Sequence, residues 1–126
     1  IGAFASQNLE SAGLENTLKK ALKSANLAAK DIDFAVFAPM GNVCDIKLKE
    51  VCEKYFGDAT KVFTSLKTGY LQSGSSLNAL SLLLCALEKK SSAFNANKFN
   101  KNCANIAVFA SPRTFNNYAM ILKAFL

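Results

Sequence analysis

The sequence predicts an α/β domain, because strand-like and helix-like segments alternate along its 126 residues. Residues 34–38 and 106–110 are apolar runs without a polar face, which is typical of strands buried on both sides. Residues 12–26 place leucine at every fourth position, as an amphipathic helix does. Such alternation favours a largely parallel sheet with helices on both faces. With 51% apolar and 19% charged residues, the chain can bury a core, so we expect a single domain over 1–126.

The expected elements follow the order β-α-β-α-β-α-β-β. In this order, Asp45 is a good N-cap for the second helix and Gly57 a good residue to end it. Glu50 and Lys54 lie four residues apart in that helix, which favours an ion pair between them. The elements are a strand at 1–5, a helix at 12–26, a strand at 34–38, a helix between Asp45 and Gly57, a strand at 61–64, a helix at 77–87, and strands at 106–110 and 118–126.

The helix expected over residues 77–87 is apolar nearly all round. A helix without a polar face is buried between layers or against a partner. This stretch is far shorter than the ~20 residues that span a bilayer, so we expect no membrane association. Since the chain begins with Ile1 rather than methionine, we also expect it to be part of a longer chain or a processed form.

Histidine is absent, which excludes a histidine base, a histidine metal ligand and any triad that contains histidine. The cysteines are Cys44, Cys52, Cys85 and Cys103, and none stands in C-x-x-C spacing. We therefore expect no metal site and no cofactor. Cys52 and Cys85 fall in apolar helical patterns, where cysteine acts as a small hydrophobic residue. Reduced thiols of this kind favour a cytoplasmic location.

The net charge of +6 comes from residues 67–126, which carry six lysines, one arginine and a single acid. A one-sided positive field suggests an anionic partner, such as nucleic acid, an acidic protein or a phosphorylated substrate, although it also serves solubility. In the Ser-, Asn- and Lys-rich segment 91–103, Phe94 and Phe99 alternate with lysines, as in proteins that bind single strands. We favour a solvated loop whose phenylalanines point inward.

Four segments carry a family pattern, in the same order and with similar spacing. They are 18–27 followed by Asp31-Ile-Asp33, 49–58 ending in Phe-Gly-Asp, Thr64-Ser-Leu-Lys-Thr-Gly-Tyr70, and 117–123. Together they resemble the C-terminal half of β-ketoacyl-acyl carrier protein synthases, of the thiolase-like superfamily. The resemblance implies a layered α/β half with a five-stranded mixed sheet and helices on both faces. It also implies an acyltransferase family of fatty-acid or polyketide-type biosynthesis, in which a full enzyme has two such halves.

The catalytic groups of this family are replaced at the matching positions. Ala38 stands where the family has the histidine of H-G-T-G-T, Tyr70 stands for the histidine of T-G-H, and Ser65 stands for the lysine before it. The resemblance implies that the two imidazoles donate hydrogen bonds to a thioester oxygen. Losing one such donor costs about 10²–10³ in rate. The family's nucleophilic cysteine belongs to the other half, so no catalytic group of the family is retained here.

These departures predict a domain that is non-catalytic by itself and acts as a structural or chain-length-factor-like partner. We expect a homo- or heterodimer with a ketosynthase-like half. The candidate pocket residues are Tyr70, Lys67, Gly69, Asn117 and Cys44. An acidic acyl carrier protein is a further candidate partner, because it would complement the positive second half. The residues expected to dock it are Lys67, Lys89, Lys90, Lys98, Lys101 and Arg113.

Two alternatives remain open, so the sequence leaves enzymatic activity undecided. A divergent acyltransferase would use Tyr70 or Cys44 on the same scaffold. A cysteine without histidine lacks its usual base, and a tyrosine hydroxyl is a poor proton shuttle at neutral pH. The other alternative is a basic nucleic-acid-binding module, which we expect less because the phenylalanines of 91–103 are better explained as core residues. Asn117 is expected to be a turn residue rather than a ligand contact.

Overall fold

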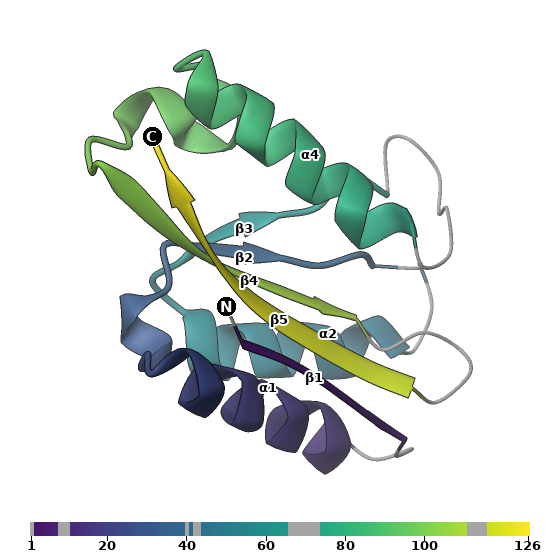
Figure 1. The fold of residues 1–126 in the computed structure, drawn as a ribbon. Helices are drawn as coiled ribbons and strands as arrows, with labels where there is room; N and C mark the ends of the chain where they lie inside the picture. The colour runs from purple at the N-terminus through teal and green to yellow at the C-terminus, as the bar shows by residue number, and fades with distance from the viewer. Residues whose placement is uncertain (1, 8–10, 40, 42–43, 66–73, 111–115) are drawn as a thin grey trace.

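The computed structural model describes residues 2–7, 11–39, 41, 44–65, 74–110 and 116–126 (Figure 1). The elements follow the predicted order of strands and helices. They are β1 (Gly2–Gln7), α1 (Ser11–Ala25), β2 (Phe34–Val36), α2 (Cys44–Phe56), β3 (Thr60–Val62), α4 (Gly74–Glu88), β4 (Cys103–Ala110) and β5 (Asn116–Phe125). Two short 3₁₀ helices, η1 (Ala29–Asp31) and η2 (Ala93–Lys98), precede β2 and β4.

The sheet is mixed, with the spatial order β1-β5-β4-β2-β3. β2 pairs in parallel with both β3 and β4, whereas β5 pairs antiparallel with β4 and with β1. The prediction of a largely parallel sheet is therefore wrong for the β5 side. The reason is chain length: only residues 111–115 separate β4 from β5, and a parallel return needs a crossover of a dozen residues or more.

Helices cover both faces of this sheet, which confirms the predicted α/β layering. Figure 1 shows α1 and α2 on one side of the sheet and α4 on the other. Consecutive residues of β2 point to opposite sides, as the pleat requires. Ala35 belongs to the core beneath α1 and α2, while Phe34 and Val36 belong to the core beneath α4 and η2. The apolar run 34–38 thus has no polar face because both of its faces are buried.

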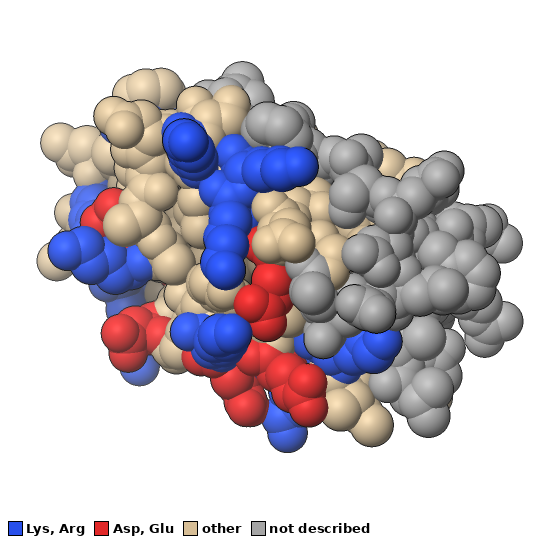
Figure 2. Space-filling model, turned by 90° about the horizontal axis from the view of Figure 1, so that it is seen from below, with Lys and Arg blue, Asp and Glu red and all other residues tan. Residues whose placement is uncertain are grey.

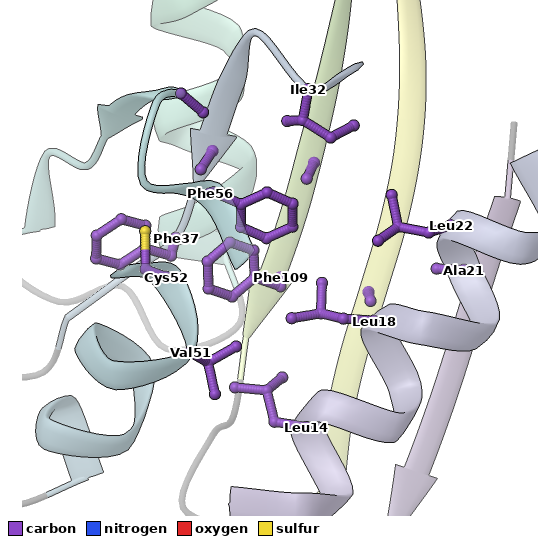
Figure 3. Packing of buried hydrophobic residues seen from close by; sticks show 14 of the residues in the cluster. Leu14, Leu18, Ala21, Leu22, Ile32, Phe37, Val51, Cys52, Phe56 and Phe109 are labelled. Carbon is purple, nitrogen blue, oxygen red and sulfur yellow. The ribbon is translucent and has the colours of Figure 1, made fainter. Parts of the chain in front are cut away.

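Phe109 of β4 is the centre of the core on the α1–α2 side. Its ring stacks on Phe37 with centroids 5.5 Å apart and lies 5.7 Å from the ring of Phe56 at the end of α2. Figure 3 shows Leu14 and Leu18 of α1 pointing toward the same ring cluster. The four-residue spacing of the α1 leucines is explained by this contact, because it keeps one helix face on the sheet.

Helix α4, predicted to be buried between layers or against a partner, is buried on one face within the described chain. Its buried face is formed by Ala79, Leu80, Leu83, Ala86 and Leu87. Its outer side is apolar but exposed, with Leu77, Leu82 and Leu84 between 40% and 55% exposed. Cys85, predicted to act as a small hydrophobic residue, is exposed on this outer side as well. The sheet lies on only one side of α4, so the described chain covers only one of its faces.

The start of α2 also differs from the expected cap. The helix begins at Cys44, so Asp45 lies in its first turn rather than before it. The Asp45 carboxylate accepts a hydrogen bond from the N–H of Gly41 at 2.7 Å. Gly41 has φ of +77°, a left-handed conformation that glycine adopts without a steric cost. The acid thus fixes the chain that enters the helix.

A carboxylate links the two helices on the outer side of this layer. Glu15 of α1 accepts hydrogen bonds from the Tyr55 hydroxyl at 2.8 Å and from Lys54 Nζ at 3.2 Å, both on α2. The hydrogen bond from Tyr55, followed by that from Lys54, lowers the pKa of Glu15. Lys54 therefore forms its ion pair with Glu15 of another helix, whereas the sequence predicted an ion pair with Glu50 of its own helix. Figure 2 shows lysines and acids mixed across this face.

Among the helices that the structure describes, none combines the length and the apolar character that crossing a bilayer requires.

We expect Phe109→Ala to lower the free energy of unfolding by about 3–5 kcal/mol, because it removes the ring shared by Phe37 and Phe56. Ile46→Ala is the matched control, since Ile46 is 59% exposed on α2 and its loss should change stability by less than about 0.5 kcal/mol. Urea unfolding measures both values. Equal effects of the two substitutions would contradict this description of the core.

We expect Glu15→Gln to alter the acid limb of the stability curve. The folded pKa of Glu15 is lowered, so its contribution is present above the unfolded pKa of about 4.3 and is lost as pH falls through the folded pKa. The stability difference between wild type and variant should therefore be largest above pH 5 and shrink on acidification. Unfolding by urea across this range measures it. A difference that does not vary with pH would contradict the Glu15 assignment.

Candidate functional site

The candidate site lies at one edge of the sheet. The parallel strands β2, β3 and β4 all end there, and β5 begins there, as the pairing of Ala110 with Tyr118 shows. Open α/β sheets bind ligands outside the carboxyl ends of their strands. Ala38 follows β2, Ser65 follows β3 and Asn117 is the second residue of β5. The structure therefore brings three of the predicted site positions to the edge where that chemistry would occur.

Ala38 stands in a closed environment directly after β2. It is 7% exposed, and its neighbours Phe37 and Pro39 are buried as well. The Phe37 N–H donates to the carbonyl of Val62 at 3.1 Å, which continues the β2–β3 pairing up to this point. A methyl group held here offers no proton and no hydrogen bond. The position is structurally intact, but it carries no polar side chain.

Ser65 is buried and its hydroxyl has a structural partner. Ser65 Oγ donates to the carbonyl oxygen of Pro39 at 2.6 Å, a bond that joins the segments leaving β2 and β3. Beside it, Asn78 of α4 donates from Nδ2 to Thr64 Oγ1 at 3.4 Å. Sequence reasoning missed both bonds, which join residues 26 and 14 positions apart and leave no local signal. These hydrogen bonds link the segments that leave β2 and β3 to each other and to α4.

The other predicted pocket residues have different outcomes. Asn117 is 1% exposed within β5, opposite Ser6 of β1, so it is a strand residue and not the expected turn residue. Cys44 is the first residue of α2. Tyr70, Lys67 and Gly69 lie outside the described residues. The site described above is therefore built from Ala38, Ser65 and Asn117 without these three residues.

The remaining cysteines are away from this edge. Cys52 is buried in α2 and packs in the aromatic core shown in Figure 3. Burial raises the pKa of the Cys52 thiol, which keeps it protonated and unreactive. Cys103 begins β4 at the opposite end of the sheet, and Cys85 lies on the outer side of α4. As predicted, Cys52 behaves as a small hydrophobic residue.

Four of the six lysine and arginine residues expected to dock a carrier protein lie at the opposite end of the sheet. Lys89 and Lys90 follow α4, Lys98 ends η2, and Lys101 stands just before β4. Lys101 Nζ forms an ion pair with Asp33, which raises the pKa of Lys101. The other two members, Lys67 and Arg113, fall outside the described residues. The basic group is thus separated from Ala38 and Ser65 by the length of the strands (Figure 1).

Phe94 and Phe99 point inward, as favoured above. Both are half-buried and pack against the core beneath α4, and the Phe99 ring lies 5.2 Å from that of Phe34. Single-strand binders need aromatic faces that bases can stack on. These rings are engaged in the core, which removes the specific feature that suggested a nucleic-acid-binding module.

Comparison with solved structures shows what this architecture is. Residues covering 99% of the chain superpose on an oxazolomycin ketosynthase domain from Streptomyces albus JA3453, with a TM-score of 0.67 and 14% sequence identity. The chain has a ketosynthase-like fold. The superposition covers 44% of that ketosynthase chain, so the present chain spans less than half of its length.

The comparison supports the fold alone. At 14% identity, the likeness does not carry catalytic residues or substrates from one protein to the other. No known protein-family profile matches this chain. No curated protein matches it either.

Proposed function

We propose that this chain is a ketosynthase-like domain of fatty-acid or polyketide-type biosynthesis that is non-catalytic by itself. In this proposal it serves as a structural or chain-length-factor-like partner of a ketosynthase-like half. The observation that carries the proposal is the side-chain content of the sheet edge. Ala38 and Ser65 occupy the positions where the resembling family has a histidine and a lysine, and both are buried and closed off.

The chemistry explains why these two residues matter. Decarboxylative condensation builds negative charge on a thioester oxygen, which must be met by hydrogen-bond donors already in place. The Ala38 methyl group has no donor. The Ser65 hydroxyl donates to Pro39 at 2.6 Å and would have to break that bond to serve a substrate. A scaffold that has no donor at Ala38 and an already engaged donor at Ser65 fits a supporting role better than a catalytic one.

The superposition is compatible with a role in a pair. This fold matches 44% of the similar ketosynthase chain, and the rest of that chain would correspond to the partner. A supporting unit needs no catalytic groups of its own, because the partner would supply them. This is the sense in which the chain would act like a chain-length factor.

The exposed lysines support an acidic carrier protein as a transient partner. Lys89, Lys90 and Lys98 are exposed and lie within two adjoining elements, α4 with its following turn and η2. Complementary charge steers such encounters and makes them sensitive to salt. We include this contact in the proposal as a docking step, separate from the sheet edge.

The purified chain should form no condensation product from acyl and malonyl thioesters above the rate without protein. Because the proposal assigns no catalysis to Tyr70 or Cys44, the variants Tyr70→Phe and Cys44→Ser should behave like wild type. Product formation is followed by mass spectrometry of the carrier-bound acyl chain. Turnover that disappears in either variant would overturn the proposal and establish the divergent acyltransferase instead.

Reversing the charge of Lys89 and Lys90 together should weaken binding of an acidic acyl carrier protein by about tenfold or more, because two attractive contacts become repulsive. The matched control reverses Lys20 and Lys23, which are equally exposed on α1 across the sheet, and should leave binding unchanged. Calorimetry at low and high salt measures both. Equal weakening by the two pairs, or an absence of binding at every salt concentration, would contradict this docking step.

A further inference from the structure

Ser92 lies in the turn between α4 and η2, at the end of the sheet that carries the exposed lysines. The residue is exposed, it directly precedes η2, and its hydroxyl makes no capping hydrogen bond to that helix. Ser91, by contrast, is half-buried, and its Oγ accepts a hydrogen bond from the N–H of Ala93 at 3.2 Å. Of these two adjacent serines, Ser92 is the one whose hydroxyl another molecule can reach.

The residues before Ser92 carry a specific charge pattern. Lys89 and Lys90 stand three and two positions before it, and both are exposed. Protein kinases select their substrates by the charge pattern around the acceptor hydroxyl. Two cations separated from the serine by one residue are the pattern that a kinase with an acidic substrate groove accepts. Ser24 of α1 is also exposed, but it has two apolar residues at the corresponding positions.

The backbone around Ser92 favours local opening. Lys90, Phe94 and Asn95 have φ between +51° and +56°, the left-handed region that residues with a side chain occupy at a cost in free energy. Lys90 does so just past the end of α4, where helices commonly place glycine. A segment with such costs on both sides of Ser92 opens more readily than a regular helix. A kinase that binds its substrate as an extended segment is therefore better served by this turn than by α1.

A phosphate group on Ser92 would remove the positive charge of this end. Lys89 and Lys90 follow α4, and Lys98 ends the adjoining η2, so three exposed lysines stand against one exposed acid, Glu88. A phosphoserine carries a charge of about −1.5 to −2 at neutral pH. One phosphate group therefore cancels nearly all of the excess positive charge of these residues.

We propose that Ser92 is a phosphorylation site and that its phosphorylation prevents docking of an acidic carrier protein. A kinase would transfer the γ-phosphoryl group of a nucleoside triphosphate. The bond from phosphorus to Ser92 Oγ forms, the bond to the nucleoside diphosphate breaks, and the hydroxyl proton passes to the catalytic base of the kinase. The effect on docking rests on the proposed function, in which these lysines attract a carrier protein. The modification itself rests on the exposure of Ser92 and on the two lysines before it.

The catalytic subunit of cyclic-AMP-dependent protein kinase, which selects paired basic residues before serine, tests the site on the folded chain. With ATP, the wild type should gain one phosphate, located on Ser92 by fragment mass spectrometry, and Ser92→Ala should gain none. Replacing Lys89 and Lys90 by alanine should slow phosphorylation about tenfold or more. The matched control replaces Lys20 and Lys23, which are equally exposed on α1, and should leave the rate unchanged. A wild type that gains no phosphate, undiminished phosphorylation of Ser92→Ala, or equal effects of the two lysine pairs would overturn the site.

Calorimetry with an acidic acyl carrier protein tests the effect on docking. The phosphorylated chain should bind about tenfold more weakly than the unmodified chain, and the difference should shrink at high salt. Removal of the phosphate by a phosphatase should restore the affinity, which separates lost charge from lost folding. Equal affinity of the two forms would overturn the effect on docking. A chain that is phosphorylated on Ser92 but binds no carrier in either form refutes the docking step of the proposed function, while the site stands. A chain that binds the carrier but takes up no phosphate refutes only the present inference.

Discussion

The structure depends on one constraint, which is that both faces of the central strands are apolar and both must be covered. Phe34 and Val36 of β2 face α4, while Ala35 and Phe37 face the opposite core. Apolar burial is the main source of folding free energy, so neither face can be left in water. On one side, α1 and α2 complete the cover. On the other side, α4 covers β2, β3 and β4 and leaves the side chains of β5 partly exposed.

This unequal cover connects the fold to the proposed function. The described chain completes one layer and leaves the other partly open, and the proposed function assigns a neighbour to that open layer. At the edge where ligands would bind, the hydrogen bond from Ser65 to Pro39 links the segments that leave β2 and β3. Ala38 adds no polar group there. In the proposed function, the surfaces that contact a partner therefore lie on α4 and at its basic end.

The sequence predicted those parts of the fold that depend on local pattern. The leucine spacing of α1 and the apolar run of β2 were sufficient, because each reports which faces are buried. The exposure of Leu77 and Leu84 was not predictable in the same way, since an apolar stripe has the same pattern whether its partner is in the chain or outside it. The contact between Glu15 and Lys54 also escaped prediction, because it joins two helices that are distant in sequence.

The candidate site depends on contacts that the sequence does not record. The family pattern singled out Ala38 and Ser65, and the structure places both at one edge of the sheet, because β2 and β3 end there. The bond from Ser65 to Pro39 depends on the packing of two loops, which no local pattern records. The lysine and arginine residues expected to dock a carrier protein were predicted from charge alone. Charge counts do not show at which end of the sheet a lysine lies.

Hydrogen exchange of the α4 amides across a range of protein concentrations tests the central claim that this face requires a partner. If the partner is a second copy that covers the exposed apolar side of α4, protection of residues 77–88 should increase as the concentration rises through the dimer dissociation constant, while α2 stays unchanged. Protection of α4 that is the same at every concentration would contradict the account.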